Sequence, residues 1–266
     1  MPGGKSVTPL FGSLVIILSL FLSPKKNEAL AANGSANPYI IVIDPGHGGE
    51  DKGAASLVGK KPLYEKDVAL GIAIRMARVL RDPKYTKPLG RRVKVLLTRE
   101  SDKEISLEAR SEIARSAKAD LFLSIHSNSE PSGVGHGVET YFLNNTDQES
   151  DSKLEEIENR TSKKRDASLL IRSIAADAVV DSSKLATETV HKSLVDHLRL
   201  RNGKVHDRGV KQAMFYVLLD AQVPAVLFEA FFLSNKRDAA FVSEGERRQE
   251  IAEGLAKGIL RYLALL

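Results

Sequence analysis

The chain of 266 residues contains no cysteine and no tryptophan. The absence of cysteine excludes disulfides, cysteine-based zinc sites and thiol nucleophiles together. The net charge of +5 comes from scattered basic clusters such as Lys163-Lys164-Arg165, and the six tyrosines and nine phenylalanines do not alternate with them. Because nothing here indicates a basic surface with stacking aromatic residues, we expect no nucleic-acid partner.

Residues 1–31 have the layout of a secretory signal. Lys5 precedes an apolar run over 10–22, and the small residues at 29–32 fit a cleavage site. The run is shorter than the ~20 apolar residues of a transmembrane helix. We therefore expect export to the periplasm or the cell exterior. The positive charge that follows the run at 24–26 leaves an uncleaved anchor open.

The rest of the chain is expected to form a short linker at 32–38 and one domain at 39–266. With 42% hydrophobic and 27% charged residues, the chain can bury a sizeable core. The pattern predicts strands over 39–44, 93–98, 121–126, 137–143 and 223–229, and helices over 66–81, 106–119, 185–200 and 244–263. This alternation predicts a single-domain α/β fold with a largely parallel sheet.

The alternation breaks at residues 144–183. The segment NNTDQESDSKLEEIENRTSKKRD is strongly charged, and the stretch that follows it, ASLLIRSIAADAVV, has the apolar spacing of an amphipathic helix. We interpret the region as an insertion between two sheet elements.

Four residues with useful chemistry stand at the ends of predicted elements. His47 follows a strand in IVIDPGHGG, His126 ends another in LFLSIHSN, Glu65 opens a helix in LYEKDVAL, and Glu229 lies in the apolar run AVLFEAFF. Ligands of such sheets bind beyond the carboxyl ends of the strands. Two imidazoles and one carboxylate are the ligand set of a catalytic zinc ion, which keeps one position open for water. Glu229 would be the general base, and Asp44 is placed to orient the imidazole of His47.

Taken singly, each residue has a plainer explanation. His47 would be a histidine in a glycine-rich turn, and His126 a hydrogen-bonded histidine at a strand end. The helix dipole favours an acid at the position of Glu65. Glu229 would be a buried carboxyl that accepts from a backbone amide. The metal-site hypothesis therefore depends on all four residues together.

The same segments carry a family resemblance. They are IVIDPGHGGEDKGA, YEKDVAL, VLLTRESDKEISLEAR, ADLFLSIHSNS, GVETYFL, DRGVKQAMFYVL and PAVLFEAFFLSN. From about residue 40 to about residue 263, the chain resembles the zinc-dependent N-acetylmuramoyl-L-alanine amidases of the amidase-3 family. Several ordered motifs of this length are a specific signal.

The resemblance implies one Zn²⁺ ion held by His47, Glu65 and His126, with Glu229 as the catalytic glutamate. It also implies a mixed sheet of about six strands flanked by helices. The implied substrate is peptidoglycan, cut at the amide between N-acetylmuramic acid and the L-alanine of the stem peptide. Such a reaction serves cell-wall remodelling or the separation of daughter cells. We expect a monomer.

The insertion has a counterpart in the cell-division members of that family. There an extra helical segment occludes the zinc cleft until an activator protein displaces it, and a glutamate of the segment reaches the metal. Glu158-Asn159 is similar, which implies an autoinhibitory contact from Glu158 to the metal; a solvated charged loop without regulatory role is the alternative. Two departures from the family pattern, Phe231 in place of glycine and Ala114-Arg115 in place of Ala-Asn, concern the shape of the cleft.

Other functions stay open from the sequence. A zinc carboxypeptidase or aminopeptidase would use the same ligand types, and a non-catalytic wall-binding protein could share the fold. A membrane-anchored structural protein would depend on the N-terminal apolar run alone.

Overall fold

The computed structural model describes residues 37–143, 152–162 and 177–266. The predicted signal, most of the predicted linker and most of the helix predicted within the insertion lie outside these ranges.

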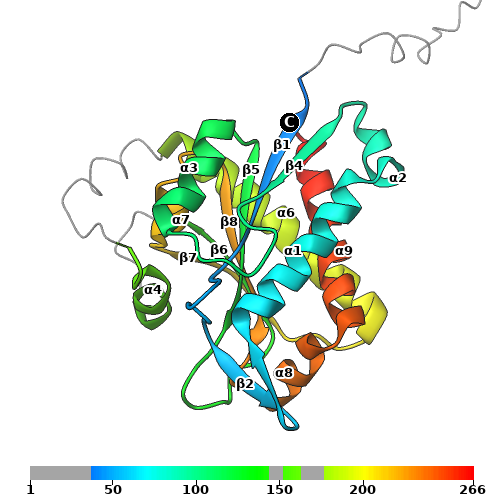
Figure 1. The fold of residues 1–266 in the computed structure, drawn as a ribbon. Helices are drawn as coiled ribbons and strands as arrows, with labels where there is room; N and C mark the ends of the chain where they lie inside the picture. Colours follow the sequence, from blue (N-terminus) through cyan, green and yellow to red (C-terminus); the bar gives the residue numbers. More distant parts are fainter. Residues whose placement is uncertain (1–36, 144–151, 163–176) are drawn as a thin grey trace, which may run out of the picture. The chain divides into compact units, whose positions relative to one another are not determined.

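The described chain is built on a six-stranded sheet (Figure 1). Its order is β4 (Val93–Leu97), β1 (Tyr39–Pro45), β5 (Leu121–Asn128), β8 (Ala225–Phe232), β6 (Val138–Leu143) and β7 (Asp207–Ala213). All neighbouring strands are parallel except β6 and β8, which are antiparallel. The prediction of a mixed, largely parallel α/β sheet is therefore confirmed.

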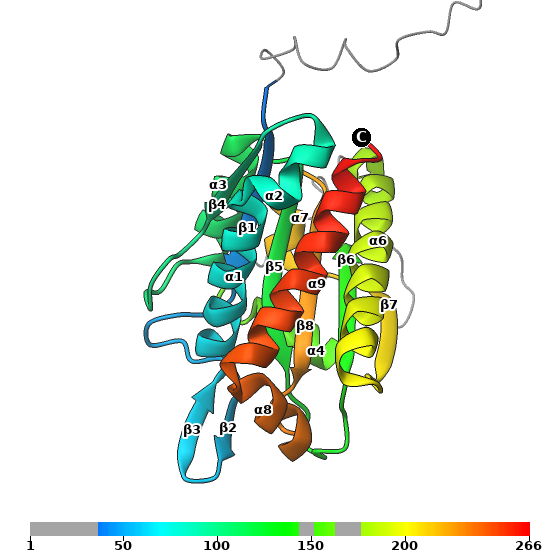
Figure 2. The same ribbon diagram turned by 90° about the vertical axis from the view of Figure 1, so that its right-hand side faces the viewer.

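Three long helices cover one face of the sheet. Figure 2 shows α1 (Glu65–Arg81), α9 (Gly245–Leu263) and α6 (Asp177–Asn202) side by side in front of the strands. Their apolar residues repeat at helical spacing, so each helix buries one stripe against the strands. In α1 this stripe includes Val68, Ile72 and Met76, all fully buried. This layer forms the larger of two apolar cores.

The opposite face carries a thinner cover. It consists of α3 (Leu107–Ala117), the short α7 (Tyr216–Leu219) and α4 (Ser152–Asn159). Alternate residues of a strand point to opposite faces, so Val42, Phe122 and Leu227 belong to this second core. His126 and Glu229, described below, are an even number of residues from Phe122 and Leu227 on the same strands and therefore point to this face.

Several elements were not predicted. They are the hairpin of β2 (Ala55–Val58) and β3 (Lys61–Tyr64), the edge strand β7, α2 (Pro83–Thr86), the 3₁₀ turn η2 (Lys87–Leu89), α7 and α8 (Lys236–Ser243). The two hairpin strands and β7 lie at or near the surface. Their sequences therefore lack the apolar run or strict alternation that marks a buried strand.

None of the helices within the described ranges has both the length and the apolar character that crossing a membrane requires.

Candidate metal centre and active site

A row of three polar side chains crosses the centre of the sheet. His126 on β5 pairs in register with Glu229 on β8, and Glu229 pairs with Glu139 on β6. All three residues are buried. Residues in register on neighbouring strands point to the same face. The strand pairing therefore gathers an imidazole and two carboxyls beneath the thin helical layer.

Four donor atoms converge beside this row. Nε2 of His47 lies 3.0 Å from Oε1 of Glu65, and Nδ1 of His126 lies 3.0 Å from the same oxygen. Oε2 of Glu158 lies 2.9 Å from Nδ1 of His126 and 3.6 Å from Nε2 of His47. In the described part of the chain, these residues are the one group of three or more acids and histidines close enough to share a metal ion.

The spacing of these atoms fits a zinc ion. Donor atoms about 2.1 Å from zinc at the corners of a tetrahedron lie ~3.4 Å apart. Three of the four distances above are somewhat shorter and one is longer, so the four atoms are close enough to share one ion. Nε2 of His47 is buried and makes no hydrogen bond of acceptable geometry among the described residues, although Oε1 of Glu65 lies 3.0 Å away. The donor set and this contact without hydrogen-bond geometry both match a metal site.

Glu65 is fixed by two backbone amides. Ala54 N donates to Oε2 at 2.7 Å, and Ser127 N donates to Oε1 at 3.0 Å. The loops on either side approach closely and leave no room for added carbon: a Cβ on Gly46 would lie 2.4 Å from Cε1 of His126, and one on Gly53 would lie 2.5 Å from Oε2 of Glu65. Glycine is therefore required at both positions by packing.

The hydrogen-bond partner of the His47 imidazole is Asp51. Nδ1 of His47 and Oδ2 of Asp51 are 2.9 Å apart, because a turn after His47 folds the chain back over four residues. The prediction that Asp44 orients this imidazole is wrong. The Asp44 carboxylate instead accepts from Thr98, Ser124 and Arg110, and reaches His47 only through the backbone.

Two buried arginines hold the loop that carries His47. Arg110 on α3 donates from Nη1 to Asp44 and to the carbonyl of Pro45, and from Nη2 at 2.7 Å to the carbonyl of His47. Arg99 donates to the carbonyls of Pro45 and Gly46. Sequence analysis missed both arginines as site residues. The sequence offered one signal for them, because both arginines stand next to elements predicted to be buried. An arginine in such a place is rarely buried without polar partners.

The charges of the cluster stabilise one another without a metal. Burial alone would favour a neutral His47, but the carboxylates of Glu65, Asp51 and Glu158 raise its pKa to about 10. Burial likewise opposes charge on His126, and Glu158 and Glu65 raise the pKa of His126 well above its ordinary value. The two imidazoles hold Glu65 ionised and its pKa below the usual range, despite burial. A metal ion requires neutral imidazoles, so metal binding here would release protons.

Glu229 stands beside this cluster with neither carboxyl oxygen bonded. Both oxygens are buried and lack a hydrogen-bond partner among the described residues. Desolvation raises the pKa of Glu229 well above its ordinary value, against the opposing effect of His126. A carboxyl with a raised pKa and free oxygens next to a metal site has the properties of a general base and acid.

Helix α4 is docked against the loop that joins β7 to α7. Leu154 is buried against the second core. Glu155 accepts from Met214 N, and Asn159 both accepts from Tyr216 N at 2.8 Å and donates to the Met214 carbonyl at 2.7 Å. These contacts place the Glu158 side chain, one turn along, in the metal cluster.

Phe231, one of the two departures from the family pattern, has a backbone conformation that is unusual for a residue with a side chain. Its φ is 67°, in the left-handed region that glycine adopts without steric cost. The backbone here therefore has the conformation that favours the glycine expected from the resemblance. Phe231 occupies it with its ring packed 4.8 Å from that of Phe241, so the large side chain is part of the first core.

Comparisons with known proteins agree with this geometry. A family model described as N-acetylmuramoyl-L-alanine amidase matches residues 41–261. The chain is 32% identical over 238 residues to the N-acetylmuramoyl-L-alanine amidase AmiA of Escherichia coli K12, covering 87% of this chain and 78% of that protein. The solved structure of the amidase AmiC2 of Nostoc punctiforme has a TM-score of 0.64 and 30% identity, covering 86% of this chain and 99% of that one.

Proposed function

Because the chain belongs to the N-acetylmuramoyl-L-alanine amidase family, we propose that it is a zinc-dependent hydrolase of peptidoglycan. The bond cut would be the amide between N-acetylmuramic acid and the L-alanine of the stem peptide, in wall remodelling or the separation of daughter cells. The observation that carries the proposal is the convergence of His47, Glu65 and His126 beside Glu229, whose carboxyl oxygens have no partner among the described residues.

Each residue has a separate task in the proposed reaction. Nε2 of His47, Oε1 of Glu65 and Nδ1 of His126 would hold the ion. When bound, zinc supplies a Lewis acid that polarises the amide carbonyl and lowers the pKa of a water molecule. Glu229 accepts a proton from the attacking water and delivers it to the leaving nitrogen of L-alanine. Asp51 holds the ring of His47 so that Nε2 faces the other donors.

The test separates metal binding from catalysis. Glu229→Gln should keep zinc and lose at least ~10²-fold in turnover, the usual contribution of a general base. His126→Ala should lose both zinc and turnover. The measurements are zinc content and the release of peptides with N-terminal L-alanine from purified peptidoglycan, with and without chelator. Glu188→Gln, at an exposed position on α6, is the matched control. A fully active Glu229→Gln variant would remove Glu229 from the mechanism.

The same assay addresses the alternative substrates. A carboxypeptidase or aminopeptidase would act on free peptides, and a non-catalytic wall-binding protein would bind peptidoglycan without releasing stem peptides. No feature of the described residues favours either function over the amidase.

We infer in addition that α4 is autoinhibitory. Glu158 would supply a fourth donor and so occupy the position that a catalytic zinc site keeps for water. The cavity left between α4 and the ligands measures about 20 Å³, room for about one water molecule and none for an amide substrate. An activator protein would have to release α4 from the 214–216 loop.

Activity should therefore rise when Glu158 is neutralised. Glu158→Gln and deletion of residues 147–180 are both expected to speed the release of stem peptides. Glu188→Gln, an equal charge change at an exposed position on α6 that lines neither cavity beside α4, should leave the rate unchanged. Equal rates for the wild type, Glu158→Gln and the deletion would contradict autoinhibition.

Export to the cell envelope is also proposed, on the layout of residues 1–31. N-terminal sequencing of the protein recovered from envelope fractions would show whether the signal is removed. The monomeric state stays a prediction, which sedimentation of the purified protein checks.

A further inference from the structure

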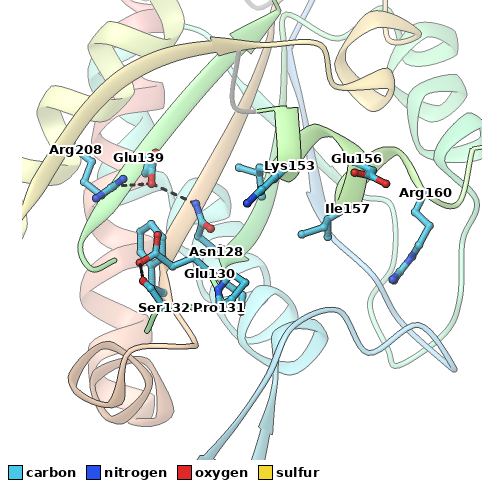
Figure 3. Close-up of a pocket in the computed structure, with 13 residues that line it drawn as sticks. Asn128, Glu130, Pro131, Ser132, Glu139, Lys153, Glu156, Ile157, Arg160 and Arg208 are labelled. Atoms are coloured by element: carbon cyan, nitrogen blue, oxygen red, sulfur yellow. Dashed lines mark hydrogen bonds and ion pairs between the residues drawn. The ribbon is translucent and has the colours of Figure 1, made fainter. Parts of the chain in front are cut away.

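A second, larger pocket lies next to the metal cluster on the side of β6 and β7. It has a volume of about 850 Å³ and is lined by residues that include Asn128, Glu130, Glu139 and Arg208 from the sheet side and Lys153 and Ile157 from α4. In Figure 3, Arg208 and Glu139 lie on one side of this space and the residues of α4 on the other. The pocket is thus open while α4 is docked.

Glu139 anchors the sheet side of the pocket. It is fully buried, accepts from Asn128 Nδ2 and Tyr141 Oη, and forms ion pairs with Arg208 and Lys211. A buried carboxylate of this kind is stable only with such partners. Since Lys211 also pairs with Glu139, Arg208 is not the sole counter-charge. Glu139 is not used by the mechanism proposed above.

Arg208 is held by one edge and exposes the other. Its Nε donates to Oε1 of Glu139 at 2.7 Å, and its guanidinium lies 4.9 Å above the ring of Phe232. Neither Nη atom has a hydrogen-bond partner among the described residues, and the side chain is 30% exposed. A planar guanidinium fixed at Nε and stacked on a ring presents two parallel N–H groups, which match a carboxylate.

The distance between the proposed metal site and Arg208 matches the position of the second residue of the stem peptide. Glu139 follows His126 and Glu229 in the row across the sheet, and Arg208 lies beside Glu139 on β7. Three strand spacings separate the Cα atoms of His126 and Arg208 by roughly 14 Å. The arginine side chain covers part of that distance, and an extended peptide advances ~3.5 Å per residue. A group on the second residue of the stem peptide is therefore within reach.

We propose that Arg208, positioned by Glu139, binds the free α-carboxylate of the second stem-peptide residue. That residue is a D-glutamate joined through its side chain, and its α-carboxyl is either free or amidated in peptidoglycan. The proposal depends on the proposed function, since it names the substrate form that the site prefers. Amidation removes the charge and one of the two acceptor oxygens, so the pocket discriminates against the isoglutamine form.

The experiment measures binding and does not require turnover. Calorimetry with the full chain compares L-alanyl-γ-D-glutamyl-L-lysine with the same peptide carrying isoglutamine. The acid form should bind about tenfold more tightly. Arg208→Gln should remove this ratio, and Arg208→Lys, which keeps the charge without the fork, should remove most of it. Arg237→Gln is the matched control, because Arg237 is exposed on α8, does not line the pocket and should leave the ratio intact.

Stem-peptide release is assayed on the same preparations of the wild type and of Glu158→Gln. The outcomes then distinguish failure of the carboxylate subsite from failure of the amidase function. A wild-type ratio near one, a ratio that survives Arg208→Gln, or no binding of either peptide at millimolar concentration overturns the carboxylate subsite. Cleavage without discrimination overturns it too, and leaves the amidase function standing. Selective binding with no cleavage by either protein contradicts the amidase function and supports the subsite.

Discussion

The unpaired carboxyl of Glu229 predicts that its neutral isostere stabilises the metal-free protein. Glu229 is 1% exposed and its oxygens have no partner among the described residues, so burial raises its pKa well above the ordinary 4.5. At pH values between 4.5 and the raised native pKa, the folded protein therefore keeps the Glu229 carboxyl protonated, whereas the unfolded chain loses this proton. Stability of the wild type falls as pH rises through this range, and Glu229→Gln lacks the penalty.

The size of the effect follows from linkage. Each pH unit between the unfolded pKa and the raised native pKa of Glu229 costs about 1.4 kcal/mol. For a domain of this size, each such kcal/mol corresponds to roughly 2–4 °C in Tm. At pH 4.5 the two proteins should differ little.

Thermal unfolding with chelator present, at pH 4.5, 5.5 and 6.5, measures this difference. Chelation matters because a bound cation would favour the ionised carboxylate. The exposed Glu188→Gln substitution should show no pH-dependent gain. If the Glu229→Gln variant is no more stable at pH 6.5, or if its gain is the same at all three pH values, the assignment of a buried, protonated carboxyl is refuted.

Three further substitutions test the framework of the site. Asp51→Asn should weaken zinc binding about 10- to 100-fold with the fold intact, measured by competition with a chelator, because His47 loses the partner at Nδ1. Gly46→Ala should lose zinc altogether, since the new Cβ would displace the His126 ring, and metal analysis checks this. Asp44→Asn should lower the free energy of unfolding by about 3–5 kcal/mol in denaturant titrations, because it leaves the buried guanidinium of α3 without its counter-charge.

Much of the fold could be predicted because buried strands and helices leave a periodic signature. The central strands β5 and β8 are buried along their whole length and read as continuous apolar runs. Helix α6 is described from Asp177, earlier than the start predicted at residue 185. The edge strand β7 and the β2–β3 hairpin escaped prediction because surface strands carry no such pattern.

The candidate site was predicted only in part, because contacts between residues on different elements leave no local pattern in the sequence. His47, Glu65, His126 and Glu229 stand out in sequence because each lies within a predicted element or next to its end, and the structure brings the first three together with Glu229 beside them. Asp51 was indistinguishable from the other polar residues of its loop. The partners of Asp44 lie on three different elements, so no local pattern could show that it bonds an arginine in place of the imidazole.

The sequence by itself determined the type of fold, the ranges of the buried strands and long helices, and the residue types available for metal chemistry, because these depend on local periodicity and side-chain identity. Apart from the ligand set and the Glu158 contact that the family resemblance implied, the tertiary structure decided which polar groups meet. The register of β5, β8 and β6 aligned His126, Glu229 and Glu139, and the docking of α4 carried Glu158 into the cluster. Such meetings depend on strand order and on packing between segments far apart in the chain, and neither leaves a local trace in the sequence.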